Sequence, residues 1–443
     1  MTLQRTRQPL ALPRPIALAL RPFQKFLQTE SASGILLLVA TGVALVWANS
    51  RFGDSYRHLL EQTISISGFG VGLSWPLHMW INDALMAAFF FLVGMEIKRE
   101  LVLGELNSLR RAILPAFAAL GGMLMPALIF VAFNAGTESL RGWGVPVATD
   151  IAFALGALAL LKGRVPASLA VFLTALAIFD DLGAIVVIAL FYGQAVNVAA
   201  LLAAVGITLL LVLMNLFGVR GLWPYLAMGM LLWIAVLNSG IHATIAGVVL
   251  GLCIPSRTRR DPAEVDVLLD RLRTVNADAQ NERFREETLS AVEGYLADTL
   301  APLDRLVRAL HPWVAFLIIP VFALANAGVE LAGLSPGDLV SPLTLGIALG
   351  LFLGKQAGIF GATWLAVKLR LSPRPSRASW SQVYGVAMLG GIGFTMSLFI
   401  SALAFPADGL LNEKAKVGIL LGSALSATVG MLFLRFAARP GDK

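Results

Sequence analysis

The sequence predicts an all-α polytopic membrane protein with about twelve transmembrane helices, and three observations support this class. Hydrophobic residues make up 57% of the 443 residues, and charged residues make up only 14%. A soluble domain is nearer about one quarter charged and does not hide this much apolar surface. Apolar stretches long enough for a helix to cross a hydrocarbon core of about 30 Å also recur along the chain.

Twelve apolar stretches follow an N-terminal tail, 1–30, and precede a short C-terminal tail, 436–443, so that the membrane domain covers 31–435. Two of them, 149–161 and 241–254, are too short to cross as ordinary helices. The predicted spans are 32–49, 77–101, 112–134, 149–161, 166–192, 198–217, 222–238, 241–254, 309–328, 342–369, 381–404 and 412–435.

The distribution of Lys and Arg predicts the orientation of these spans. With the N-terminus inside, the inside segments hold 28 of the 34 Lys and Arg residues and the outside segments hold five, while Lys355 lies within a span. This is the positive-inside bias of membrane proteins. It explains the net charge of +7 without a nucleic-acid partner, and it places both termini in the cytoplasm.

Two segments outside the spans have their own character. Residues 63–76 are rich in β-branched residues and glycine and predict an outer β-hairpin, with a plain loop as the alternative. Residues 256–305 form a charged cytoplasmic insertion in which apolar residues recur at steps of three and four, the pattern of an amphipathic helix. That helix either packs on the membrane domain or serves as a partner site.

The single cysteine and the four scattered histidines predict no disulfide and no Cys/His metal cluster. The candidate functional groups are therefore carboxylates inside the predicted spans. Asp180 and Asp181 lie at the midpoint of the span 166–192, where a charged group costs on the order of 3 kcal/mol or more and is a functional hypothesis by default. Adjacent helical residues point about 100° apart, so at most one of the two points straight at any given partner. Helix packing by neutral carboxyl groups is the structural alternative.

Interrupted spans place further polar groups at depth. Thr149 and Asp150 stand where a half-helix begins, and the unpaired N–H groups of a helix start favour a carboxylate there. The alternative is an N-cap at the membrane surface. A second interruption, at Gly390, Gly391 and Gly393, predicts unwound backbone, with close helix packing as the alternative. Two interrupted spans in different halves are the sequence pattern of a transporter site at the midplane.

Three sets of charged residues complete the candidates. Lys355 is the one cation well inside a span, and it can pair with an aspartate. Glu96, Lys98, Arg99 and Glu100 at the inner end of 77–101 form either an ion-pair cluster or, with Asp83, a funnel that gathers cations. The intrinsic pKa of a histidine side chain lies near neutrality, so His242 suits pH sensing, with a structural role as the alternative.

These groups predict a transporter rather than an enzyme. A carboxylate can hold a proton or, with other oxygens, a small hard cation, and competition between the two couples opposite fluxes. The sequence has no Walker A motif that would indicate a nucleotide-driven pump. The interpretation is a cation/proton antiporter without a cofactor, and with two carboxylates more than one proton can move per cation. A Na⁺-coupled symporter of an organic anion is the alternative.

The motifs "ATDIAFALG", "FDDLGAIVVIALFY", "SGIHATIAG", "LHPWVAF", "INDALMAAFFFLVGMEIKREL" and "GGIGFTMSLFI" resemble the NhaA family of bacterial Na⁺/H⁺ antiporters from about residue 30 to 435. The resemblance implies inverted-topology repeats, with 149–161 and 381–404 as discontinuous helices that cross at the midplane. It also implies that Asp180 and Asp181 carry the ion and the protons, supported by Asp150, Thr149 and Lys355.

The resemblance further implies electrogenic export of Na⁺ or Li⁺ in the bacterial inner membrane, activation at alkaline pH, and a homodimer made partly through 63–76. Two departures concern the pH response. The insertion 256–305 is longer than the family's loop, and Val307 and Arg308 stand where members often carry Glu-His.

Overall fold

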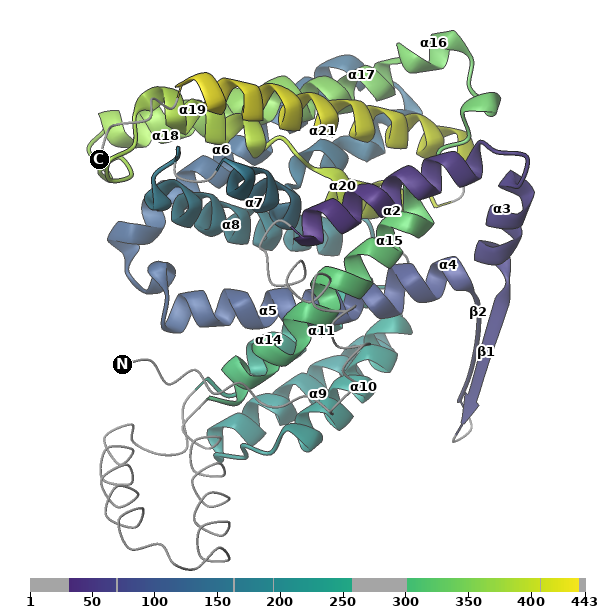
Figure 1. The fold of residues 1–443 in the computed structure, drawn as a ribbon. Coiled ribbons are helices and arrows are strands. Elements are labelled where there is room, and N and C mark those ends of the chain that lie inside the picture. Colours follow the sequence, from purple (N-terminus) through teal and green to yellow (C-terminus); the bar gives the residue numbers. More distant parts are fainter. Residues whose placement is uncertain are drawn as a thin grey trace, which may run out of the picture.

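The computed structural model describes residues 32–68, 71–161, 164–193, 195–256, 301–406 and 408–437. The tails 1–30 and 438–443 and nearly all of the insertion 256–305 lie outside the described residues, so the predictions for them stay untested. The described chain is mostly helical, and its helices form two bundles that pack side by side (Figure 1).

The first bundle surrounds the two interrupted spans. The most extensive contacts between its helices are those of α6 with α18, α17 with α21, and α19 with α21. They are α6 (Leu109–Asn134), the 3₁₀ segment η3 (Glu138–Val147), α7 (Ile151–Leu160), α8 (Ala167–Phe191), α17 (Pro342–Leu349), the π segment η6 (Gly350–Gly354), α18 (Lys355–Lys368), α19 (Trp380–Leu389), α20 (Phe394–Ala404) and α21 (Gly409–Ala437).

The second bundle is centred on the packing of α5 against α11. Its members are α2 (Ala32–Ala48), α4 (Leu77–Met79), the π segment η1 (Trp80–Leu85), α5 (Met86–Val102), α9 (Val198–Leu216), α10 (Leu222–Leu237), α11 (Thr244–Cys253), α14 (Pro302–Trp313), the π segment η4 (Val314–Ile318) and α15 (Ile319–Asn326). Short connectors are α3 (Gly53–Glu61), η2 (Glu105–Asn107), η5 (Leu331–Gly333) and α16 (Pro336–Leu339).

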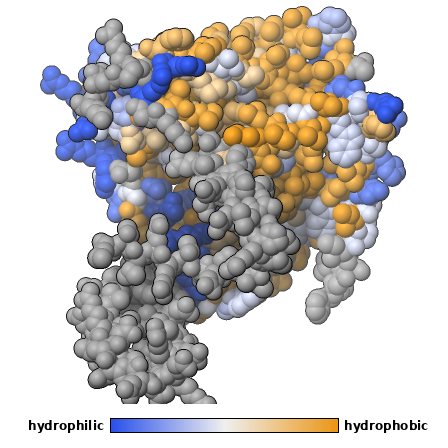
Figure 2. All heavy atoms as spheres, viewed as in Figure 1, coloured by the Kyte–Doolittle hydropathy of each residue, from blue (hydrophilic) through white to orange (hydrophobic). Residues whose placement is uncertain are grey.

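The predicted class of polytopic α-helical membrane protein is confirmed. Seven helical stretches among the described residues are long and apolar enough to cross a membrane, and three further helix pairs qualify as bent spans. Each predicted stretch corresponds to a helix or helix pair, but α10 and α11 are shorter than a full span, so the count of twelve stays a prediction. Hydrophobic side chains cover the middle of the face in Figure 2, and hydrophilic ones gather toward opposite sides.

The segment 63–76 forms the predicted hairpin, which excludes the plain loop. Strand β1 (Thr63–Gly68) pairs antiparallel with β2 (Val71–Pro76) in a register that places Ser65 opposite Ser74. Their hydroxyl oxygens are 2.7 Å apart. Neither strand pairs with a third strand among the described residues, so each presents an unpaired edge.

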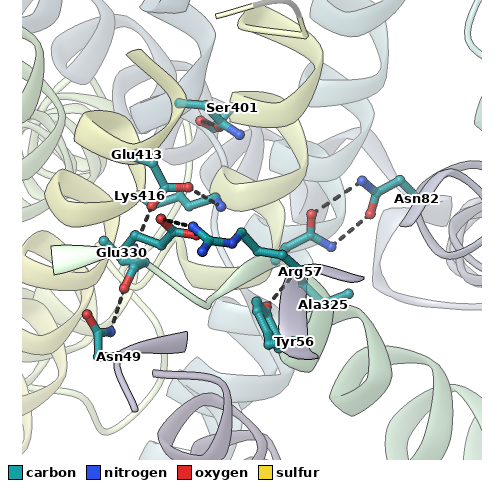
Figure 3. Close-up of polar contacts among 12 residues, drawn as sticks. Asn49, Tyr56, Arg57, Asn82, Ala325, Glu330, Ser401, Glu413 and Lys416 are labelled. Atoms are coloured by element: carbon teal, nitrogen blue, oxygen red, sulfur yellow. Dashed lines mark hydrogen bonds and ion pairs between the residues drawn. The ribbon is translucent and has the colours of Figure 1, made fainter. Parts of the chain in front are cut away.

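Polar contacts link the segment that follows α15 to the connector α3 and to α21 of the first bundle (Figure 3). Arg57 donates to both carboxylate oxygens of Glu330 at 2.6 Å, and the Glu330 N–H donates to a carboxylate oxygen of Glu413, on α21, at 3.0 Å. Asn82 and Asn326 exchange side-chain amide bonds of 3.3 and 2.8 Å. The first set of bonds links α3 and the segment after α15 to α21, and the amide pair links η1 to α15.

Candidate functional site

The two interrupted spans meet at their breaks. The pairs η3–α7 and α19–α20 are each bent by 44°. The Asp150 N–H donates to the Ile392 carbonyl at 2.6 Å, and the Thr149 hydroxyl donates to the Gly390 carbonyl at 2.9 Å. Each break thus supplies partners for backbone groups that the other leaves without a helical partner, which is what allows irregular backbone inside a membrane domain.

The glycines of the second break are required by close approach rather than by backbone conformation. Gly390 and Gly393 have φ values of −60° and −92°, which any residue adopts. A Cβ on Gly391 would lie 2.4 Å from the Leu351 carbonyl oxygen and 2.5 Å from the Ser426 hydroxyl. The predicted break is therefore present, and the packing alternative explains why glycine stands there.

Asp150 ties the two half-helices together. Its carboxylate caps α7 by accepting from the Phe153 N–H at 3.0 Å, and it accepts from both the N–H and the hydroxyl of Thr395 at the start of α20, at 3.1 and 2.5 Å. The positive ends of two helix dipoles converge on this carboxylate. Asp150 is only 2% exposed, so this N-cap lies inside the packed helices.

Lys355 forms a fully buried ion pair with Asp180. Its ammonium donates to the Asp180 carboxylate at 2.7 Å and to the Thr149 hydroxyl at 2.9 Å, and the side chains of Lys355 and Asp180 are both 0% exposed. Lys355 is the first residue after the π segment η6. The other oxygen of Asp180, Oδ1, is buried without a hydrogen-bond partner in the described chain. A buried carboxylate oxygen without a partner is one to which a proton or a cation can bind.

Asp181 points elsewhere, as adjacent helical positions require. It lines a cavity of about 720 Å³ that lies between the two bundles, and it is itself only 3% exposed. Thr149 and Asp150 line the same cavity. One carboxylate of the pair is therefore held by a lysine, while the other faces a space that water and ions can enter.

The charged residues of α5 divide into two groups. Glu96, Arg99 and Glu100 line the cavity, as a funnel requires. Lys98 instead donates to the carbonyls of Leu252 and Ile254 beyond the cavity, at 2.8 and 2.6 Å. Lys98 points to the other side of α5 because it is two residues after Glu96, and two helical residues rotate a side chain by about 200°.

The structure does not bring Asp83 and His242 to this cavity either. Asp83 lies in η1, roughly 20 Å along the helix axis from Glu96 at 1.5 Å per residue. A ring nitrogen of His242 bonds the Tyr192 carbonyl at 2.6 Å, at the end of α8. Sequence reasoning missed two residues that the structure places at the site: Thr395 on Asp150 and His311 in the cavity wall. The signal for Thr395 was its position at the start of the half-helix after the glycines.

The two broken helices bond to each other at their breaks, beside a buried lysine and three buried aspartates. Such a site inside a multi-pass helical membrane domain is typical of secondary transporters. Comparisons with known proteins agree. The sequence profile of the family "Na+/H+ antiporter 1" matches residues 24–434, and this chain belongs to that family. The resemblance to the NhaA family is thus confirmed.

Curated relatives match over nearly their whole length. A protein of Anaeromyxobacter sp. (strain Fw109-5) named Na(+)/H(+) antiporter NhaA is 51% identical over 428 residues, which cover 96% of this chain and 94% of that protein. A protein of Rhodospirillum rubrum with the same name is 48% identical over 426 residues, with 95% and 98% covered. Among solved structures, the sodium proton antiporter MjNhaP1 from Methanocaldococcus jannaschii shares the fold, with a TM-score of 0.51, 14% identity and 92% of each chain covered.

Proposed function

We propose that this protein is a Na⁺/H⁺ antiporter of the bacterial inner membrane that exports Na⁺ or Li⁺ in exchange for protons. Membership of the family and the names of the relatives support the exchange of Na⁺ for H⁺. The observation that carries the mechanism is the arrangement of Asp180 and Asp181. Asp180 has a carboxylate oxygen without a hydrogen-bond partner in the described chain, and the neighbouring Asp181 faces the cavity.

Asp181 and the free oxygen of Asp180 are the proposed ion ligands, completed by water in the cavity. Na⁺ is a small hard cation that prefers oxygen ligands, and a proton binds the same oxygens. Occupation by one excludes the other, so Na⁺ binding on one side releases protons and protonation on the other side releases Na⁺. This competition couples the two ion fluxes, so no organic substrate is needed.

Lys355 is the proposed charge balance of the site. While Na⁺ is absent, its ammonium neutralises Asp180 at 2.7 Å, which makes an ionised carboxylate tolerable in a dry environment. Na⁺ that binds to Asp180 competes with this ammonium. If more than one proton leaves the groups of this site when Na⁺ binds, exchange is electrogenic.

The cavity is the proposed pathway from the cytoplasm. Its wall includes Glu96, Arg99 and Glu100, at the end of α5 that the positive-inside bias assigns to the cytoplasm. Alternating access then requires the bundles to shift and the polar network around Glu330 to rearrange. The unpaired edge of the hairpin 63–76 is the proposed contact for a second copy of the chain, because exposed strand edges pair readily.

The test measures exchange in everted membrane vesicles with an inside-acid gradient, followed with a pH-sensitive dye as NaCl, LiCl or KCl is added. Wild type is expected to lose its gradient on addition of Na⁺ or Li⁺, and Asp181→Asn is expected to retain it. Asp338→Asn, which removes a carboxylate paired with Lys414 outside the cavity, is the matched control and is expected to behave as wild type. A wild-type gradient that no inorganic cation alters from pH 6 to 9 would refute the proposal and favour uptake of an organic anion.

A further inference from the structure

The turn that precedes Lys355 is the π segment η6, which is wider than an α-helical turn, and the side chain of Gln356 bonds to it. In a regular α-helix the Phe352 carbonyl would accept the N–H of Gln356, four residues on, but Phe352 lies in the π segment η6. Here the side-chain amide of Gln356 donates to that carbonyl at 2.5 Å. Gln356 is 4% exposed, so this bond forms away from solvent.

Gln356 is in turn held from α19. The Tyr384 hydroxyl donates to the side-chain oxygen of Gln356 at 2.7 Å. Two edge-to-face contacts fix the Tyr384 ring, with Phe360 at 5.2 Å and with Phe433 at 5.5 Å between ring centroids. The hydroxyl therefore has a defined position, set by α18 and α21 as well as by its own helix.

These bonds close a loop with the ion pair. The C-terminal end of α19 leads to Gly390, whose carbonyl accepts the Thr149 hydroxyl, and that hydroxyl oxygen accepts the Lys355 ammonium. Helix α19 thus contacts the residue pair Lys355–Gln356 twice, through Tyr384 and through Gly390 with Thr149. A shift of α19 against α18 changes both contacts together.

The widened turn also packs closely against α6 and η3, which restricts its movement. A Cβ on Gly354 would lie 2.8 Å from the Pro126 Cα of α6, and a Cβ on Gly350 would lie 2.9 Å from the Pro146 Cβ of η3. Because each helical residue turns the chain by about 100°, one residue more or less in this turn decides whether Lys355 faces Asp180.

We propose that Gln356 and Tyr384 are positioning residues for exchange. They keep η6 widened, and so they hold the Lys355 ammonium between Asp180 and Thr149. This inference rests on the proposed function, in which Lys355 competes with Na⁺ for Asp180. Loosening the turn weakens that competition, so Na⁺ binds at lower concentration once the carboxylates are ionised.

The experiment measures the KM for Na⁺ and the maximal rate of exchange at alkaline pH in the same vesicles for Tyr384→Phe, which removes the hydroxyl and keeps the ring. Loss of one neutral hydrogen bond typically shifts an equilibrium about fivefold. We expect the KM to fall about threefold to tenfold, with the maximal rate within about twofold of wild type. Tyr225→Phe on α10, which removes a hydroxyl that donates to the carbonyl of Val219 before that helix, is the matched control and is expected to change neither.

A double-mutant cycle separates this role from a general packing role. If both residues act through one contact, Tyr384→Phe is expected to add nothing in the Gln356→Met background, whereas independent packing effects add. An unchanged KM in Tyr384→Phe, or additive effects in the cycle, would overturn the inference. Wild type that exchanges Na⁺ together with an inactive Asp181→Asn would show that the proposed function survives such a result.

Discussion

Replacing Lys355 by methionine is expected to leave Asp180 as an uncompensated charge in the core of the first bundle. At a separation of 2.7 Å and an effective dielectric constant of about 20, the attraction between the two charges is about 6 kcal/mol. Desolvation offsets part of this attraction, and breaking a buried pair by removing one partner typically costs about 3–5 kcal/mol.

The assay is the apparent melting temperature of the purified full-length protein in detergent at pH 8. At an unfolding entropy of about 2.1 cal/mol/K per residue, Lys355→Met is expected to melt roughly 3 to 5 °C below wild type. Adding Asp180→Asn to Lys355→Met removes the stranded charge and is expected to recover most of the loss. Lys414→Met breaks a pair with Asp338 whose side chains are 17% and 21% exposed, and it is expected to lower melting by far less. A double variant no more stable than Lys355→Met would refute the stranded-charge reasoning.

Two further predictions concern the break and the hairpin. Gly391→Ala places a methyl group 2.4 Å from the Leu351 carbonyl oxygen and is expected to abolish the folded protein in size-exclusion chromatography, whereas Gly361→Ala on α18 meets nothing within 4 Å and is expected to be neutral. Normal folding of Gly391→Ala would show that the break tolerates a wider separation. Replacing the hairpin 63–76 by a short linker is expected to convert the proposed homodimer to a monomer in light scattering without abolishing exchange, and a dimer that survives this deletion would place the contact elsewhere.

The sequence predicted groups whose effect is local. Asp150 caps a half-helix because a carboxylate three residues before an N–H reaches it whatever surrounds the helix, and the structure shows that bond to Phe153. The hairpin likewise follows from short-range β-branched and glycine patterning, and its register is as local as the turn. The apolar stretches are set by the length that a membrane demands, and each has its helix.

The sequence did not predict which aspartate pairs with Lys355. Asp180 and Asp181 are chemically identical, and 100° of helical rotation separates the one that meets the lysine from the one that faces the cavity. The π segment before Lys355 adds a further shift in register that apolar periodicity does not reveal. For the same reason Lys98, two residues from Glu96, could not be assigned a side of α5 in advance.

By itself, then, the sequence determined the class of protein, the spans and the residues able to carry charge, because hydropathy, charge bias and capping act within a few residues of the chain. Only the tertiary structure decided the partners: Thr395 on Asp150, the ammonium of Lys355 on Asp180, and Tyr384 on Gln356. Those pairs join residues that are 28 to 245 positions apart. Their geometry depends on the packing of whole helices, where a rotation of one residue replaces one partner with another.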